Sequence, residues 1–248
     1  MKCLILAAGY ATRLRPLTDN FPKPLLKVGD RAILDWLVDD IGGCGSVDGF
    51  VVISNHRFAG LFRDWAAGRP ESITVVDDGT STNETRLGAV KDIQFAVYSL
   101  GINEDILVIA GDNLLDFSLS LFVDYSREKG TSCVMRYFEP SVERLRKCGV
   151  LELDPSDLVL GMEEKPSEPK SNWCCPPFYY YTAADAALIP EGIGSGCGTD
   201  APGSFVAWLS SRVPVHAMEM PGRRYDIGTL ESYRSVCKTF ENIQNNRI

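Results

Sequence analysis

Residues 4–26 combine a short apolar run, a turn of small residues and two cations on restricted loops. The run is too short for a helix and is typical of a buried strand. It ends in an Ala-Ala-Gly turn at residues 7–9, where the backbone can approach a ligand closely and bare N–H groups can point at phosphate oxygens. Arg13 follows this turn, and Lys23 stands between two prolines that restrict its backbone. This arrangement predicts a triphosphate site.

Two acidic residues stand where a parallel sheet would present them to a ligand. Asp112 directly follows the apolar run 106–110, within Gly-Asp-Asn, and Asp226 precedes the last helical pattern, within Tyr-Asp-Ile-Gly-Thr. Carboxylates beyond the carboxyl ends of strands face the ligand crevice and can bind Mg²⁺ through oxygen. By local pattern alone, such acids are more often helix caps or turn residues.

The elements that must position these residues alternate along the first half of the chain. Apolar strands separated by helices predict a parallel sheet with helices on both faces. Ligands of such sheets bind beyond the carboxyl ends of the strands, so the turn at 7–9, residues 79–88 and residues 111–113 should converge. The expected strands cover residues 4–8, 50–53, 73–76 and 106–110, and the expected helices cover residues 33–41, 58–65 and 87–100.

The second half of the chain is mixed. A hairpin is expected around Asp154-Pro155-Ser156. The Gly- and Ser-rich residues 191–203 are expected to form a long loop, a kind of segment that is often functional. No internal repeat or clear linker is present, so one domain over residues 1–248 is expected. The other expected elements are helices 119–125, 205–209 and 231–244 and strands 131–137, 150–153, 158–162, 179–181 and 213–218.

The composition is that of an ordinary globular protein, with 45% hydrophobic and 23% charged residues among 248. A net charge of −8 speaks against a nucleic-acid partner. Eight cysteines without a C-x-x-C pair, and only two histidines, speak against a zinc site. Reduced cysteines fit a cytoplasmic protein, and Cys174 and Cys175 are expected to be core thiols rather than a bridge. The N-terminus is a poor signal peptide and no apolar run approaches the ~18 residues of a membrane span, so no membrane partner is expected.

The N-terminal motifs resemble those of a known family. The small-residue turn, Thr12-Arg13, Pro-Leu-Thr at 16–18 and Pro-Lys-Pro-Leu-Leu at 22–26 occur in the order seen in sugar-phosphate nucleotidyltransferases, the nucleoside-diphosphate-sugar pyrophosphorylases. The family usually has Gly where this chain has Ala11. The stretch is not a Walker A loop, because the Gly-Lys-Ser/Thr ending is absent. The resemblance implies an α/β, Rossmann-like fold, with a mixed, mostly parallel sheet, helices on both faces and a small acceptor-binding lobe. Residues 1–118 would be mainly the nucleotide-binding half, 119–228 mainly the acceptor-binding half, and 229–248 a C-terminal helix.

The resemblance also implies a role for each matching residue in nucleotide binding and transfer. Arg13 would stabilise the β- and γ-phosphates and the departing pyrophosphate, and Lys23 would bridge the α-phosphate and the acceptor phosphate. Asp112 and Asp226 would hold the catalytic Mg²⁺. The residues implied to contact the nucleoside are Leu6, Ala8, Gly9, Asn83 and Gly88, although the loop 79–86 around Asn83 matches the family poorly.

Residues 163–166, Glu-Glu-Lys-Pro, are typical of an exposed charged turn but match a family motif. The match implies that Glu164 hydrogen-bonds hydroxyl groups of the acceptor, that Lys165 grips its phosphate, and that the backbone of Gly149 meets the sugar. Where the family usually has Thr-Gly, this chain has Cys-Cys-Pro-Pro at 174–177, and proline lacks an N–H, so the acceptor pocket must differ. Residues 200–203, Asp-Ala-Pro-Gly, could line this pocket, but also suit a helix start.

We therefore predict an enzyme that transfers a nucleoside monophosphate from an NTP to a sugar 1-phosphate and releases pyrophosphate. The substrate partners would be the NTP, with dTTP or UTP favoured, and the phosphorylated acceptor. A sugar 1-phosphate oxygen is already anionic, so in-line attack needs no general base. A cytidylyltransferase for a small phosphorylated alcohol or phosphonate, a guanylyl enzyme and a catalytically silent nucleotide-sensing subunit remain open. The sequence does not determine the base, the acceptor or the oligomeric state, a homo-oligomer included.

Overall fold

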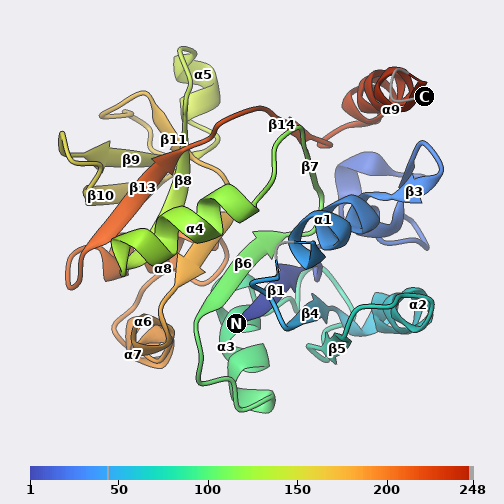
Figure 1. The fold of residues 1–248 in the computed structure, drawn as a ribbon, viewed down its shortest axis with the longest axis horizontal. Coiled ribbons are helices and arrows are strands. Elements are labelled where there is room, and N and C mark those ends of the chain that lie inside the picture. Colours follow the sequence, from blue (N-terminus) through green and yellow to red (C-terminus); the bar gives the residue numbers. More distant parts are fainter. Residues whose placement is uncertain (44, 246–248) are drawn as a thin grey trace. The chain divides into compact units, whose positions relative to one another are not determined.

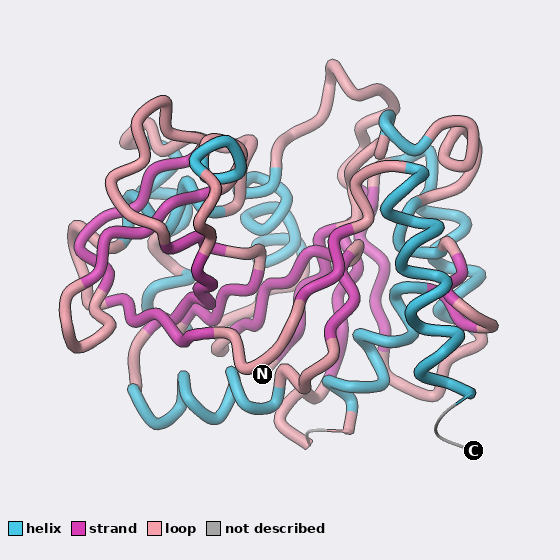
Figure 2. Tube along the Cα trace, turned by 90° about the horizontal axis from the view of Figure 1, so that it is seen from above, coloured by secondary structure: helices cyan, strands magenta, loops and turns pink. Residues whose placement is uncertain are grey.

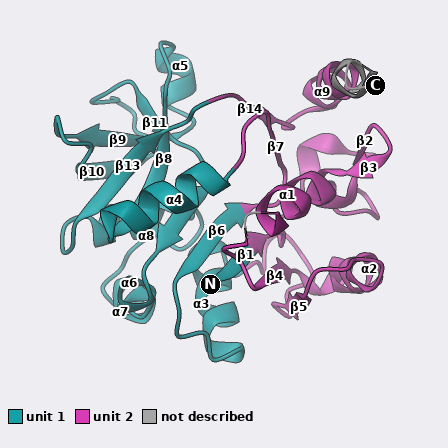
Figure 3. Ribbon diagram, viewed as in Figure 1, with its two compact units in different colours: residues 1–4, 87–109, 119–221 teal, residues 5–86, 110–118, 222–248 magenta. Residues whose placement is uncertain are grey.

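The computed structural model describes residues 1–43 and 45–245, with side chains described up to residue 240. The chain divides into two compact units that interleave along the sequence (Figure 3). Unit 1 holds residues 1–4, 87–109 and 119–221, and unit 2 holds residues 5–86, 110–118 and 222–248. The chain passes from unit 2 to unit 1 at residue 119, where the expected acceptor-binding half begins. Residues 87–109 belong to unit 1 although the segments on either side of them belong to unit 2, and residues 222–248 return to unit 2. The expectation of a single domain stays a prediction.

The sheet of unit 2 is parallel where its register is resolved. The end of β1 lies beside β4, and β4 pairs with β5 in parallel from Phe50 opposite Ile73 to Ser54 opposite Asp77. Every residue of β4 is buried, which is typical of a strand covered on both faces. The helices and longer strands of this unit are β1 (Lys2–Leu6, whose start lies in unit 1), α1 (Ile33–Gly42), β4 (Gly49–Ser54), α2 (His56–Ala67), β5 (Ile73–Asp77) and α9 (Leu230–Asn245) (Figure 1).

Short elements of unit 2 carry the residues that the sequence singles out. A two-stranded antiparallel ladder joins β7 to β14, and its register places Leu114 opposite Tyr225 and Asp226 opposite Asn113. Neither strand has enough residues to show a period, so the sequence did not predict them. The short elements are η1 (Thr12–Leu14), η2 (Lys23–Leu25), β2 (Lys27–Val28), β3 (Arg31–Ala32), β7 (Asn113–Leu115) and β14 (Arg224–Asp226).

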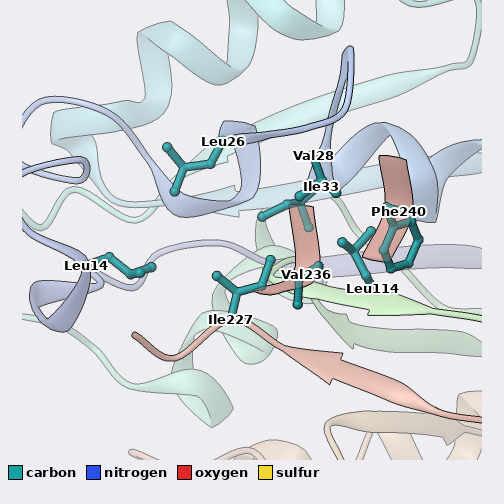
Figure 4. Packing of buried hydrophobic residues seen from close by; sticks show 8 residues of the cluster. All are labelled: Leu14, Leu26, Val28, Ile33, Leu114, Ile227, Val236 and Phe240. Carbon is teal, nitrogen blue, oxygen red and sulfur yellow. The ribbon is translucent and has the colours of Figure 1, made fainter. Parts of the chain in front are cut away.

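One apolar cluster in unit 2 packs these short elements together (Figure 4). Its buried side chains come from segments that are far apart in the sequence: η1, the loop after η2, α1, β7, the residue after β14, and α9. Burial of each side chain of this size stabilises the fold by about 1.5–3 kcal/mol. The cluster therefore fixes the backbone on which Arg13, Lys23 and Asp226 stand. Its buried members are Leu14, Leu26, Val28, Ile33, Leu114, Ile227, Val236 and Phe240.

Unit 1 contains a mixed sheet with strand order β10-β9-β11-β8-β12-β6. Strand β13 pairs with β8 outside this order. Among the pairings of this unit whose register is given, β13 pairs with β8 in parallel, while β12, β11 and β10 pair antiparallel with their neighbours. Helix α4 packs on β8 and β13, and α8 packs on β10. Figure 2 shows the strands of the chain in magenta and its helices in cyan. The strands are β6 (Ile106–Ala110, whose last residue lies in unit 2), β8 (Ser132–Phe138), β9 (Gly149–Leu153), β10 (Val159–Glu164), β11 (Trp173–Cys175), β12 (Phe178–Tyr181) and β13 (Val215–Glu219). The helices are α3 (Ala89–Ser99), α4 (Ser120–Lys129), α5 (Val142–Leu145), α6 (Ala183–Ala186), α7 (Ile189–Gly194) and α8 (Gly203–Leu209).

The expectation of a loop over residues 191–203 was wrong at both ends. Residues 191–194 belong to α7, which begins with Ile189 and has Pro190 in its first turn, where the missing N–H costs nothing. Gly203 opens α8, so the loop covers residues 195–202 only. Glycines suggested a loop, but Gly192 lies inside α7, where Phe205 and Trp208 would contact any side chain.

The cysteines agree with the expectation of thiols where the structure tests it. The seven cysteines among the described residues are free, and Cys174 and Cys175 are buried thiols as expected. Cys44 lies outside the described residues. Across residues 1–43 and 45–245, we find no helix with the length and apolarity needed to cross a membrane.

We expect truncation of the buried cluster to destabilise the chain strongly. Leu114→Ala, at a fully buried position, should cost about 2–5 kcal/mol because it removes apolar contacts and leaves a cavity. Leu160→Ala removes the same atoms from a side chain that is 63% exposed and serves as the matched control. Urea unfolding followed by circular dichroism measures both, and equal losses in the two variants would contradict the packing described.

Candidate active site

The turn after β1 is held by hydrogen bonds that leave Gly9 uncovered. The Ala7 N–H donates to the Ile53 carbonyl at 2.9 Å, and the buried Asn55 amide donates to the Ala8 carbonyl at 2.9 Å. No described atom outside its chain neighbours lies within 4 Å of where a side chain on Gly9 would start. Ala11, where the family usually has Gly, adopts φ 45°, a left-handed conformation that costs an L-residue about 1–2 kcal/mol. Ala11 thus adopts a conformation that glycine would adopt without this cost.

An ion pair in unit 2 joins the loop that carries Lys23 to the loop that carries Asp112. Lys23 Nζ lies 2.7 Å from Asp112 Oδ2, with the lysine side chain 8% exposed and the aspartate 38% exposed. The other carboxylate oxygen of Asp112 accepts from the Asn113 side-chain amide at 3.0 Å. Gly111 brings the loop against β1, since a Cβ there would come within 2.9 Å of the Ile5 side chain. Both oxygens of Asp112 are therefore oriented before any ligand binds.

The β7–β14 ladder brings the second expected acid beside the first. Asp226 is the partner of Asn113, the residue that follows Asp112. Arg224 on the same strand donates to the Asn113 side-chain oxygen at 2.8 Å, and lies 4.0 Å from Asp226 Oδ1. Asp226 is 57% exposed, so its carboxylate remains accessible.

Three charged residues line a cavity of about 180 Å³ in unit 2, and Asp226 adjoins its lining residue Ile227. Arg13, Lys23 and Asp112 line it directly, and the residues after Asp226 line it as well. A Cβ at Gly228 would lie 3.4 Å from Asp226 Oδ2 and 3.8 Å from Arg13 Nη1, so the carboxylate and the guanidinium both border this glycine. The lining residues are Leu6, Ala7, Gly9, Ala11, Arg13, Leu14, Lys23, Pro24, Ala110, Asp112, Ile227 and Gly228.

Asp112 and Asp226 offer oxygen donors of the kind that Mg²⁺ binds. Within the described part of the chain, no group of three or more His, Cys, Asp or Glu side chains forms a ready-made metal cage. Mg²⁺ usually binds through one or two carboxylates together with waters and phosphate oxygens. Asp112, directly before β7, and Asp226, opposite Asn113 on β14, offer two hard oxygen donors of this kind.

The expected nucleoside contacts divide between the units. Leu6 and Gly9 line the cavity, and Ala8 stands between its lining residues Ala7 and Gly9. Asn83 lies in the exposed loop of unit 2, where its side-chain oxygen accepts from Arg86 at 3.1 Å, and it is not part of the cavity lining described here. Gly88 lies in unit 1 before α3, with φ 91° that only glycine adopts easily. The roles of these residues in nucleotide binding stay predictions.

The expected acceptor residues lie together in unit 1. Glu164 at the end of β10 pairs with Gly149 at the start of β9, and a Cβ at Gly149 would come within 3.3 Å of Glu164 Oε1. Lys165 follows with φ 51°, a conformation whose strain often marks functional residues, and its N–H donates to the Cys148 carbonyl at 2.8 Å. Their roles in acceptor binding stay predictions.

Burial dominates the electrostatics of Glu164. Desolvation raises the pKa of this carboxyl, and nearby Cys148 and Asp200 raise it further. Lys165 and the backbone N–H of Gly203 lower the pKa because they stabilise the carboxylate. Glu164 is thus a partly desolvated acid whose ionised form is favoured by the charge of Lys165 and by the Gly203 N–H.

Sequence reasoning missed several residues of these sites. Gly228 and Arg224 adjoin Asp226, and the Asp-Ile-Gly-Thr motif could have drawn attention to the glycine. Ala110 and Pro24 line the cavity but carry no chemical signal of their own. Gly203 was considered only as part of a segment that could line the acceptor pocket.

Comparison with known proteins relates this arrangement to one family. Residues 2–242 match the family described as nucleotidyl transferase. The chain is 26% identical to a glucose-1-phosphate adenylyltransferase from Fervidobacterium nodosum over 93% of its length and 59% of that protein. It is 26% identical to a UTP–glucose-1-phosphate uridylyltransferase from Synechocystis over 94% of its length and 61% of that protein. It is also 29% identical to a glucose-1-phosphate thymidylyltransferase from Streptomyces griseus, over 97% of its length and 67% of that protein. The chain therefore spans about three fifths of the first two relatives.

A solved structure shows the same fold. A crystal structure of UDP-glucose pyrophosphorylase complexed with UDP-glucose superposes with a TM-score of 0.83 at 21% identity, and the match covers 97% of this chain and 98% of that one. At this identity the likeness concerns the fold alone. It confirms the expected α/β, Rossmann-like class with a mixed, mostly parallel sheet and helices.

The Lys23–Asp112 pair should contribute measurably to stability. Asp112→Asn should cost about 1–3 kcal/mol, because it leaves the buried Lys23 ammonium without its anion. In a double-mutant cycle with Lys23→Met, we expect a coupling of about 1–2 kcal/mol. The exposed pair Lys170–Glu152, at 3.1 Å, is the control and should couple by less than about 1 kcal/mol. Strictly additive losses at Lys23 and Asp112 would show that the pair does not form in solution.

Glu164 should make stability fall as the pH rises. Its pKa in the folded chain is raised above the unfolded value, so the native state keeps a proton that the unfolded state has lost. Stability is therefore lost as pH rises from the unfolded pKa through the folded pKa. Glu164→Gln should raise the melting temperature relative to the parent at about pH 8, with a smaller difference at about pH 4. The adjacent exposed Glu163→Gln is the control, and parallel curves for Glu164→Gln and the parent would contradict the assignment.

Proposed function

The chain belongs to the nucleotidyl transferase family, and we propose that it transfers a nucleoside monophosphate from an NTP to a sugar 1-phosphate, with release of pyrophosphate. One observation carries the proposal: two cations and one carboxylate line one cavity of unit 2, and a second carboxylate, Asp226, borders its lining residue Gly228. Arg13 and Asp226 border the same glycine, Gly228, and both stay solvent-accessible. Charged residues with a purely structural role would not need this arrangement. Binding of a polyphosphate together with a metal ion needs both kinds of charge, cations for the phosphate oxygens and carboxylates for the metal.

The cations would bind and orient the phosphates of the NTP. Arg13 stands on an exposed 3₁₀ turn at the cavity, and its guanidinium can bind two phosphate oxygens at once. Lys23 is a buried point charge that Asp112 holds in place. Charge developing on the phosphoryl oxygens and on the leaving pyrophosphate is thus met by donors that need no reorganisation. The acceptor phosphate is already anionic, so the cavity needs no general base.

The two carboxylates would hold Mg²⁺. When bound, this ion neutralises the repulsion between the triphosphate and the attacking phosphate and orients both. Asp112 is oriented by its hydrogen bonds with Lys23 and Asn113. Asp226 is carried by a strand whose partner is the segment after Asp112. The chain's own part in the reaction is therefore to fix two acids and two cations around one phosphate chain.

The proposed choice of nucleotide and acceptor rests on the named activities of the relatives. We favour a pyrimidine NTP, dTTP or UTP, with a hexose 1-phosphate such as glucose 1-phosphate as the acceptor. Two of the three relatives above are named for uridylyl or thymidylyl transfer and one for adenylyl transfer, and all three are named for glucose 1-phosphate. Retention of all four charged residues supports an enzyme rather than a catalytically silent nucleotide sensor.

A pyrophosphate-release assay tests the proposal. We expect the chain with Mg²⁺ to release pyrophosphate from one of five NTPs only when a sugar 1-phosphate is present, and EDTA to abolish this. Arg13→Ala and Asp226→Asn should each lower kcat by about 100-fold, since each removes a charge that acts on the phosphates. Arg144→Ala, at a side chain that is 74% exposed, is the matched control and should leave kcat unchanged. Wild-type rates in Asp226→Asn would remove this residue from the reaction, and tight NTP binding without turnover would favour a sensor.

A further inference from the structure

Two glycine backbones enclose the carboxyl group of Glu164 in unit 1. Gly149 lies across the β9–β10 ladder, and Gly203, the first residue of α8, approaches from the packed helix. A side chain on Gly203 would overlap both the Glu164 carboxylate and the end of the Met162 side chain. Only glycine at position 203 lets the helix backbone reach Glu164.

The segment that carries Gly203 is anchored at its other end to the start of α3. The Ala89 N–H donates to the Asp200 carbonyl at 3.2 Å, and the Val90 N–H donates to the Thr199 carbonyl at 3.0 Å. Gly88 packs so closely on this segment that a Cβ there would come within 3.0 Å of the Asp200 Cα. Residues 199–203 therefore form a short bridge between the Gly88 turn and Glu164.

We propose that Gly203 is a positioning residue for acceptor recognition: its backbone holds the Glu164 carboxylate, and the bridge 199–203 fixes that carboxylate relative to the Gly88 turn. The inference rests on the proposed function, because it concerns the acceptor of that reaction. A carboxylate only accepts hydrogen bonds, so its remaining lone pairs suit the hydroxyl groups of a sugar. The usual Thr-Gly of the family is replaced at residues 174–177, and Gly203 supplies a backbone N–H and a close approach in this unit.

The Gly203 N–H favours the ionised form of Glu164, whereas burial and two neighbouring groups favour its neutral form. Burial and the neighbours Cys148 and Asp200 raise the pKa of the carboxyl, while Lys165 and Gly203 lower it. Two further buried groups, Cys175 on β11 and Tyr181 on β12, are close enough to interact with its charge. Displacement of Glu164 by an added methyl group would weaken the Gly203 hydrogen bond and raise this pKa.

Steady-state kinetics of Gly203→Ala test the inference. The KM for the sugar 1-phosphate should rise about ten- to hundred-fold, the loss expected for a displacement of about 1 Å, while the KM for the NTP stays within about two-fold. The acid limb of kcat/KM for the acceptor should move to higher pH, because protonated Glu164 loses acceptor capacity. Gly194→Ala is the matched control, since no described atom lies within 4 Å of its added Cβ. It should keep the parent values.

A double variant separates positioning from simple overpacking. Met162→Ala removes the side chain that the new methyl group would also meet, but leaves the overlap with Glu164. If Gly203 positions the carboxylate, Gly203→Ala/Met162→Ala keeps its raised KM relative to Met162→Ala. If the double variant recovers the KM of Met162→Ala, the effect is packing alone and the inference fails. Circular dichroism and urea unfolding show that each variant is folded.

The outcomes distinguish this inference from the proposed function. An active parent with an unchanged KM in Gly203→Ala overturns the positioning role and leaves the nucleotidyl transfer intact. An equal rise in the KM values for both substrates also overturns it, because the effect would then not be confined to the acceptor. A folded parent that turns over no sugar 1-phosphate with any NTP overturns the proposed function, and the inference with it.

Discussion

The antiparallel ladder between β7 and β14 ties together segments whose contacting side chains are 111 residues apart in the sequence. Its register satisfies two requirements, one for an apolar contact and one for polar groups. Leu114 points its apolar side chain into the buried cluster of unit 2, while Asn113 and Asp226 occupy the polar end of the same ladder. A slip of β14 by one residue would turn Asp226 to the face that Tyr225 now occupies, toward the apolar cluster. The apolar cluster therefore specifies the position of an acid that takes no part in the packing.

The charged site depends on that packing in a second way. Lys23 is almost completely buried, a position that is costly for an ammonium group unless an anion is held against it. Asp112 is held there because Gly111 lets its loop meet β1, and because Asn113 fixes its second oxygen. The neighbouring cluster residues Leu14 and Ile227 fix the backbone beside Arg13 and Asp226 in the same way. Catalytic charges of this kind need rigid apolar support, since misplacement by about 1 Å can cost on the order of 100-fold in rate.

Long, periodic elements and the motif residues on them could be predicted from the sequence. The apolar runs of β4 and β6 and the helices α1, α2 and α3 have enough residues to show a period, and the fold class follows from their alternation. The three-residue strands β7 and β14 show none, so Asp112 and Asp226 were paired only through the family resemblance. Gly203 was not recognised as a functional residue, because its role lies in the absence of a side chain beside Glu164, a residue far away in the sequence. The interleaving of the two units likewise depends on contacts that no local pattern records.

Direct location of the metal tests the central claim, that two distant acids share one divalent ion. The measurement is anomalous diffraction from crystals of the chain grown with Mn²⁺ and a non-hydrolysable NTP. We predict one anomalous peak within coordination distance of carboxylate oxygens from both Asp112 and Asp226, with phosphate oxygens completing its ligands. A peak on the NTP that neither carboxylate touches, or a peak bound by Asp112 with Asp226 directed elsewhere, would contradict it.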